Sequence, residues 1–262
     1  GVLLAVDNAH GASLRFLPQS LHPIDLGADI CCDSAHKTLP ALTGSAYLHI
    51  GKSAPPIFSL QAETAMALFT STSPSYLILQ SLDRLNAYLE DGYEKKLALF
   101  AKKVSELKAR LEIDTVGDEP LKLTLAPKSY GYSGDELADI LSDAGMTCEF
   151  SDPDFTVMML TPKLGEDALD KIEASLALLP RREAIGEKAP RLVVGKSVMS
   201  PREAIFKASE EVDVRSAVGR VLAASCISCP PAAPIAVCGE LISEETLGLL
   251  EYYGIKTVQV IK

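Results

Sequence analysis

The chain has 262 residues, a formal net charge of −10, and hydrophobic residues at 47% of its positions. This apolar content suffices for one large or two modest cores, and an acidic chain without a basic stripe is a poor nucleic-acid binder. No stretch is apolar enough for a membrane span, and the first residues lack the basic start of a signal peptide.

Two short apolar runs near the start of the chain each lead into a polar segment. Val2–Val6 precedes Asp7-Asn8-Ala9-His10-Gly11, and Ala28–Cys32 precedes Asp33-Ser34-Ala35-His36-Lys37-Thr38. Such runs are typical of buried parallel strands, and chemistry in α/β sheets gathers just beyond the carboxyl ends of those strands. We therefore expect Asp7 and Lys37 to face one crevice.

The pairing of Asp7 with Lys37 indicates a particular cofactor. A lysine amine can form a Schiff base with an aldehyde, and an aspartate can hold a pyridine nitrogen protonated. These are the two protein groups that mark a pyridoxal 5′-phosphate (PLP) site. Either residue alone would be an ordinary strand-end side chain, but the paired motifs, with His36 beside Lys37, favour PLP.

The elements that follow are predicted from periodicity and capping signals. We expect a loop at Leu14–Pro18, a short helix or turn at His22–Gly27 and a third strand at Ser45–Ile50. A helical run covers Ser59–Leu68. A long helix should then start at Ser75, with Thr70–Ser73 as its cap, Pro74 at its first position and a bend near Gly92.

The second half of the chain alternates strand and helix patterns. Ser133 and Glu136 have the spacing of a capping box, and Ser200-Pro201 has the pattern of a capped helix start. The other expected elements are strands at 121–125, 147–150, 156–160, 219–224, 234–237 and 257–261, and helices at 165–179 and 243–253.

These motifs together resemble the Orn/Lys/Arg decarboxylase family. Val6–Ala12 and Ser34–Thr43 are similar to the family's D-x-A-H-G-A and S-x-H-K-T segments. Further similarity follows at Ser71–Leu77, at Gly219-Arg220, and from Pro230-Pro231 through Gly239-Glu240. The chain departs from the family pattern where Asn8 stands in place of the usual Glu. Cys238 likewise replaces the proline that is usual before Gly-Glu.

The resemblance implies an α/β fold, part of a fold-type I PLP-dependent large domain. It implies four segments, namely 1–75 as the C-terminal part of the PLP-binding domain, 76–111 as a connecting helix, 112–182 as a small α/β domain, and 183–262 as a C-terminal decarboxylase domain. It also implies that the chain is N-terminally incomplete, because the phosphate loop and ring-stacking residue of the family lie upstream.

The resemblance also assigns roles to individual residues. Lys37 would be the Schiff-base lysine, Asp7 the partner of the pyridine nitrogen, His10 a neighbour of the ring, and Ala9 the small residue that lets the ring lie close. His10 could instead be a histidine satisfied by backbone in its turn. The other expected contacts are phosphate contacts from Ser34 and His36, a phosphate contact across a homodimer or higher homo-oligomer from Ser71 and Thr72, and a contact to the basic substrate tail from Glu240.

Ser34 and His36 could alternatively cap a local turn, Ser71 and Thr72 could serve only as a helix cap, and Glu240 could be a solvated turn residue. His22 and His49 have no partner in the sequence and are interpreted as structural. No metal site is expected.

The function that this resemblance implies is PLP-dependent decarboxylation of lysine, arginine or ornithine to an amine and CO2, as in polyamine biosynthesis. Residues 111–180 contain no arginine to clamp the substrate carboxylate, which fits a reaction in which that carboxylate leaves. The alternatives are another fold-type I enzyme, an aminotransferase or lyase, and a truncated relative without catalysis.

Six cysteines are scattered along the chain, unlike a disulfide framework. The Cys226-x-x-Cys229 pair lacks the second pair or histidines of a zinc site. We therefore expect reduced thiols in a cytoplasmic protein.

Overall fold

The computed structural model describes residues 1–228 and 233–262, so that Cys229 and the Pro230-Pro231 motif lie outside the described residues. The chain forms two compact units. The first comprises Gly1–Leu111, Asp118–Leu123 and Met159–Ala177, and the second comprises Glu112–Gly117, Thr124–Met158 and Leu178–Lys262. The predicted division into four segments stays a prediction.

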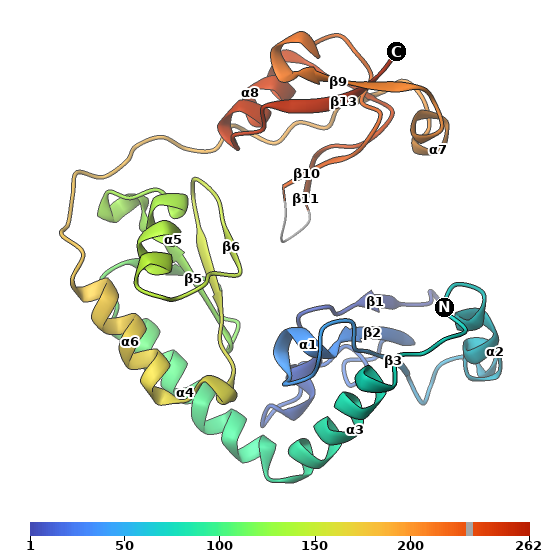
Figure 1. Ribbon diagram of the computed structural model, residues 1–262, viewed down its shortest axis with the longest axis vertical. Coiled ribbons are helices and arrows are strands. Elements are labelled where there is room, and N and C mark those ends of the chain that lie inside the picture. The colour runs from blue at the N-terminus through green and yellow to red at the C-terminus, as the bar shows by residue number, and fades with distance from the viewer. Residues whose placement is uncertain (229–232) are drawn as a thin grey trace. The chain divides into compact units, whose positions relative to one another are not determined.

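A three-stranded sheet of order β1-β2-β3 opens the first unit (Figure 1). β1 (Ala5–Asp7) pairs parallel with β2 (Ile30–Ser34), and β2 pairs antiparallel with β3 (Ala46–Ile50). The parallel pair was predicted, but the expectation that both strands are buried is wrong for β1. Its alternate residues Ala5 and Asp7 are exposed, and β1 is an edge strand whose one pairing partner among the described strands is β2.

The connection between β1 and β2 is more ordered than predicted. The expected loop at Leu14–Pro18 overlaps a 3-10 helix, η1 (Ala12–Phe16). The predicted turn at His22–Gly27 is present and closes at Gly27, whose φ of 105° is a left-handed conformation that suits glycine. Beyond β2 the chain makes a single helical turn, α1 (Ala35–Thr38), and this turn carries Lys37.

The long helix expected from Ser75 to Leu111 is two helices, α3 (Tyr76–Glu90) and α4 (Tyr93–Arg110), preceded by α2 (Pro56–Ala67). Gly92 separates them rather than bending one helix, because its backbone is left-handed, with φ of 66°. Ser75 caps α3 by accepting a hydrogen bond from the Ile78 amide, so Pro74 lies before the helix and not at its first position.

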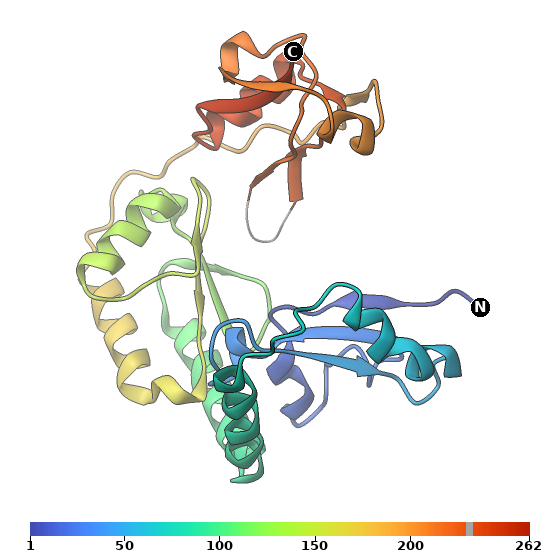
Figure 2. The same ribbon diagram turned by 45° about the vertical axis from the view of Figure 1, so that its right-hand side comes forward.

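Helix α6 (Glu166–Ala177) packs along α4 within the first unit, and both views show the two helices side by side (Figures 1 and 2). The apolar face of α4 is buried as its periodicity predicts, at Leu97, Phe100, Val104 and Leu107. Arg110 forms a two-pronged ion pair with Glu173 of α6, with both N–O distances at 2.7 Å.

A second sheet has the order β4-β5-β7-β6. Its strands are β4 (Asp114–Val116), β5 (Lys122–Ala126), β7 (Thr156–Met159) and β6 (Phe150–Ser151), and its connections include η2 (Pro127–Tyr130), α5 (Gly134–Asp143) and η3 (Pro162–Leu164). Half of the predicted capping box forms at α5, because Ser133 accepts from the Glu136 amide while the Glu136 carboxylate pairs with Arg182.

The C-terminal part of the second unit has its own apolar core. Its elements are β8 (Lys196–Ser197), α7 (Pro201–Ile205), β9 (Ser209–Asp213), η4 (Val214–Ser216), β10 (Cys226–Ser228), β11 (Ala233–Ala236), β12 (Glu240–Leu241), α8 (Glu244–Tyr252) and β13 (Thr257–Ile261). The strand expected at 219–224 is reduced to isolated bridges at Val221 and Leu222. Ser200 and Glu203 form the complete capping box at α7.

Candidate active site

The two residues that the sequence pairs lie at neighbouring strand ends. Asp7 is the last residue of β1 and lies opposite Cys32 of β2, which is parallel and adjacent. Lys37 is exposed on α1, directly after β2. Both groups therefore leave the sheet at the edge formed by the carboxyl ends of the parallel pair, where α/β proteins place their ligands.

His10 is the side chain that the structure brings to Lys37. The Lys37 Nζ lies 3.2 Å from the His10 Nε2. His10 belongs to a tight turn in which the Gly11 amide donates to the Asn8 carbonyl at 2.9 Å. Glycine suits this turn because a Cβ at position 11 would overlap the Asn8 side chain. The turn thus directs a histidine from the end of β1 to the lysine beyond β2.

His36 and Ser34 flank the lysine on either side of the start of α1. The His36 Nδ1 donates to the Ser45 carbonyl at 3.0 Å, so the Nε2 is the ring nitrogen left for another ligand. Ser34 occupies the N-cap position of α1, yet its side chain makes no capping hydrogen bond. The predicted phosphate contacts of these two residues stay predictions.

The remaining predicted site residues come from three other places in the chain. Ala9 is half-buried in the turn after β1. Ser71 and Thr72 are exposed before α3, and the Ser71 hydroxyl accepts from the Ser73 amide at 3.1 Å. Glu240 lies in the second unit, where its carboxylate accepts from the Val237 amide at 3.0 Å. Their expected roles stay predictions.

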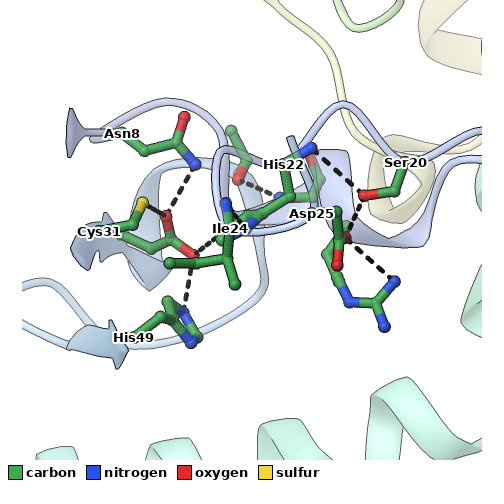
Figure 3. A network of polar contacts seen from close by, with 11 residues as sticks. Asn8, Ser20, His22, Ile24, Asp25, Cys31 and His49 are labelled. Carbon is green, nitrogen blue, oxygen red and sulfur yellow. Dashed lines mark hydrogen bonds and ion pairs between the residues drawn. The ribbon is translucent and has the colours of Figure 1, made fainter. Parts of the chain in front are cut away.

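A buried carboxylate behind the site, Asp33, is the group that sequence reasoning missed. Asp33 is 2% exposed and lies within β2. Its Oδ2 lies 2.9 Å from the Nε2 atoms of both His22 and His49, and its Oδ1 accepts from the Asn8 amide nitrogen at 2.7 Å. Figure 3 shows Asn8, Cys31 and His49 directed toward this carboxylate from different segments.

These hydrogen bonds decide the charge of Asp33. Burial alone would raise the pKa of its carboxyl, but the hydrogen bonds from His49, His22 and Asn8 outweigh that effect and lower the pKa to about 2. The neighbouring Cys31 thiol is buried and faces the carboxylate, and both effects raise its pKa to about 12. Asp33 is therefore ionised at neutral pH, and Cys31 is an unreactive thiol.

His22, Asp33 and His49 also offer the donor set of a divalent metal site, since one ligand atom from each lies within 4.8 Å of the others. The proton on His22 argues against that interpretation. The Ile24 amide donates to the His22 Nδ1 at 3.3 Å, so that nitrogen carries a lone pair and the Nε2 carries the proton donated to Asp33. A metal ion could bind the Nε2 only by displacing that proton, and in this structure hydrogen bonds join the three side chains instead.

One signal in the sequence could have revealed this network. A charged residue inside an apolar strand must find partners when it is buried. The prediction ended the strand at Cys32, which made Asp33 a residue of the polar segment, whereas β2 continues to Ser34. With Asp33 placed inside the strand, His22 and His49 become its natural partners.

Comparison with known proteins identifies the family. The model of the Orn/Lys/Arg decarboxylase major domain matches residues 1–117, which contain Asp7, His10 and Lys37. The chain belongs to the Orn/Lys/Arg decarboxylase family. A Bacillus subtilis relative, the uncharacterized protein YaaO, is 30% identical over 94% of this chain and 55% of its own length. An arginine decarboxylase of Halalkalibacterium halodurans is 29% identical over 95% of the chain and 55% of its own length.

This decarboxylase-family chain therefore spans about half the length of the curated relatives that it matches. The lysine decarboxylase LdcF of Francisella novicida has the same fold, with a TM-score of 0.70 at 18% identity, and the match covers 99% of this chain and 53% of that one. The fold is thus that of fold-type I enzymes, a class that uses PLP. Among the described residues, no helix combines the length and the apolarity that crossing a bilayer requires.

Proposed function

We propose that the protein to which this chain belongs is a PLP-dependent decarboxylase that converts lysine, arginine or ornithine to the corresponding amine and CO2. The observation that carries the proposal is the contact of Lys37 with His10 at the parallel strand ends, where β1 also ends in Asp7. An amine for the aldehyde and a carboxylate for the pyridine nitrogen are the two protein groups that mark a PLP site, and here an imidazole lies beside the amine.

Lys37 and Asp7 would hold the reactive parts of the cofactor. PLP, when bound, supplies an aromatic ring that accepts the electrons released as the bond from Cα to the carboxylate breaks. Lys37 would hold the aldehyde carbon through its amine. Asp7 would keep a proton on the pyridine nitrogen, which keeps the ring a strong electron acceptor. The exposure of both side chains on the present surface leaves them accessible to a ligand.

His10 would act as a proton acceptor and donor for the Lys37 amine. Its Nε2 lies within hydrogen-bonding distance of the Lys37 Nζ, so it can accept a proton from the amine or return one. Ala9, being small, would let the ring lie close to the backbone. The Ser34 hydroxyl, which makes no capping bond, and the Nε2 of His36 would contact phosphate oxygens.

The assembly that we propose is a homodimer or higher homo-oligomer in which Ser71 and Thr72 reach the phosphate of the neighbouring subunit. Exposed apolar side chains around this segment support an interface there, because such patches on soluble proteins mark interaction sites. They include Leu60, Leu68, Phe69, Tyr76 and Leu77, each more than two-thirds exposed.

The reaction and substrate follow from the same site. The absence of an arginine from residues 111–180 favours loss of the substrate carboxylate over the clamping that transamination uses. Glu240 would face the basic tail of the substrate. The free thiols of Cys31, Cys32, Cys148 and Cys238 fit a reducing compartment, and we place the protein in the cytoplasm.

The experiment that tests this proposal is reductive trapping. The protein to which this chain belongs is incubated with PLP, treated with borohydride and digested, and the modified peptide is identified by mass spectrometry. We expect the cofactor on Lys37, with no trapping in Lys37→Ala and unchanged trapping in Lys52→Ala, which removes an exposed lysine of the same unit. Release of CO2 and an amine from lysine, arginine or ornithine by the loaded protein then separates decarboxylation from formation of a keto acid.

Absence of an adduct on Lys37 in that folded protein would contradict the proposal and favour a non-catalytic relative. Formation of a keto acid without CO2 would instead favour an aminotransferase.

A further inference from the structure

Asn8 joins the two strand ends that carry the site. Its backbone amide donates to the Cys32 carbonyl at 2.9 Å, and its side-chain amide donates to the Asp33 Oδ1 at 2.7 Å. Asn8 also begins the turn that ends at Gly11 and contains His10. The residue that follows Asp7 is therefore bound by its main chain and its side chain to the strand that leads to Lys37.

We propose that Asp33, acting through Asn8, is a positioning residue that sets the place of His10 against Lys37. The relevance of this role to catalysis rests on the function proposed above. The positioning of His10 by Asp33 and Asn8 does not depend on that function, because it involves atoms of this chain alone.

The Asp33 carboxylate can serve as a fixed reference point because donors from several segments hold it. His22 in the connection after β1, His49 on β3 and the Cys31 thiol on β2 all donate to it in addition to Asn8. Its side chain is 3% exposed, so water does not compete for these bonds. A shift of Asp33 would break hydrogen bonds to at least three segments at once.

The carboxylate in turn decides which way the Asn8 amide faces. A carboxylate can only accept, so the NH2 group of Asn8 must point to Asp33 and its oxygen must point away. That orientation places the Asn8 oxygen over Gly11, where the absence of a Cβ leaves room for it. The Asn8 side chain thus lies between Asp33 and Gly11, and the turn that it begins holds His10 with its Nε2 3.2 Å from the Lys37 Nζ.

Asparagine at position 8 is complementary to the buried Asp33, whereas the glutamate that the resemblance leads us to expect would not be. A glutamate there would bring a second carboxylate against the buried Asp33, where like charges repel strongly. Asparagine supplies the one required donor and no charge. Asn8 and Asp33 are thus a complementary pair, and exchanging their side-chain types should preserve the link.

The test is a reciprocal exchange. Asn8→Asp places two carboxylates together and should push the turn away from β2. The double variant Asn8→Asp with Asp33→Asn restores a donor between the positions, and the new amide oxygen at position 33 still accepts from His22 and His49. Asn86→Asp is the matched control, because its side chain is exposed and accepts a bond from Tyr47, which an aspartate also accepts.

Two readouts need no cofactor. The first is the pH titration of the His10 ring followed by NMR. The second is the rate at which an amine-reactive reagent modifies Lys37. We expect Asn8→Asp to change the Lys37 rate about tenfold and to shift the His10 titration, and we expect the double variant to return both to within about twofold. The yield of PLP trapped on Lys37 should follow the same order in the same variants.

The outcomes distinguish the two proposals. If wild type traps no PLP but the His10 and Lys37 readouts change and recover as expected, the positioning role stands and the proposed function fails. If Asn8→Asp lowers the melting temperature without moving either readout, the link is merely structural and the positioning role is overturned.

A second variant is needed in case Asn8→Asp does not fold. If Asn8→Asp does not fold, Asn8→Ala removes the link without adding a charge and should move the same two readouts. A folded double variant that fails to restore them would equally overturn the proposal.

Discussion

The sheet β1-β2-β3 and the C-terminal part of the second unit are stabilised by different means. The sheet places an ionised carboxylate, Asp33, at its centre and two histidines beside it. The C-terminal part buries an apolar cluster of Val214, Ala217, Leu222, Ile235, Ala236, Ile242, Leu249, Leu250, Val258 and Val260. No charged group belongs to that cluster among the described residues.

The two regions should therefore respond to different changes, the sheet to protonation and the C-terminal part to changes in side-chain volume. Hydrogen bonds to a buried charge are directional, hold strand ends at defined positions and depend on protonation. Apolar packing is non-directional, depends on volume and is nearly indifferent to pH. The candidate site lies in the region that is stabilised by hydrogen bonds to a buried charge. Such directional bonds suit a site whose side chains must be held at defined positions.

The largest effect should come from a cavity in the apolar cluster. Leu249→Ala removes a side chain that is 2% exposed and should lower the local free energy of unfolding by about 3 kcal/mol. Hydrogen exchange read by mass spectrometry should show faster exchange in 209–262 and unchanged exchange in β1–β3. Leu99→Ala, which changes a side chain that is 64% exposed in α4, is the matched control and should change little. Equal effects of the two variants would contradict an apolar core at Leu249.

A smaller effect should follow acidification of the sheet. The pKa of Asp33 is lowered from 3.8 to about 2 by the folded structure, so its stabilising contribution is complete above about pH 4 and is lost as pH falls toward 2. The loss should amount to about 2 kcal/mol. Hydrogen exchange in β1–β3, compared at pH 4 and pH 2, should reveal this loss in wild type and a smaller one in Asp33→Asn.

The apolar cluster in the same molecule is the internal reference for that measurement. If the protection of 209–262 falls as much as that of β1–β3 between the two pH values, acid sensitivity does not arise at Asp33. The Asp33 carboxylate is faced by four side chains, His22, His49, Asn8 and Cys31. Of these four, the two histidines are the ones that gain a positive charge on protonation.

The smallest effect should come from a helix cap at the edge of the apolar cluster. Ser243 accepts a hydrogen bond from the Thr246 amide at 3.2 Å and starts α8. Ser243→Ala should lower the local free energy of unfolding by about 1 kcal/mol. Ser105→Ala is the control, because this serine is exposed in the interior of α4, where alanine favours the helix slightly. Denaturant titration followed by hydrogen exchange would separate the two, and equal losses would contradict the cap.

Local signals predicted the elements of the molecule better than their ends. Periodicity placed the buried face of α4, and serine followed by proline placed the start of α7, because both depend on residues close in sequence. The same signals misjudged Gly92, since one glycine inside a periodic pattern fits a bend or a stop equally well. The structure resolves this ambiguity, because Gly92 has a left-handed backbone with φ of 66° and separates α3 from α4.

Residue types at short spacings were enough to predict the family, the α/β fold and the two motifs at the ends of β1 and β2. The folded structure was needed to show that His10 contacts Lys37, and that Asn8, His22 and His49 all contact Asp33. These contacts join residues 11 to 27 positions apart. Pairing at such separations is set by the register of parallel strands and by the demand of a buried charge for partners, neither of which is visible in a local pattern.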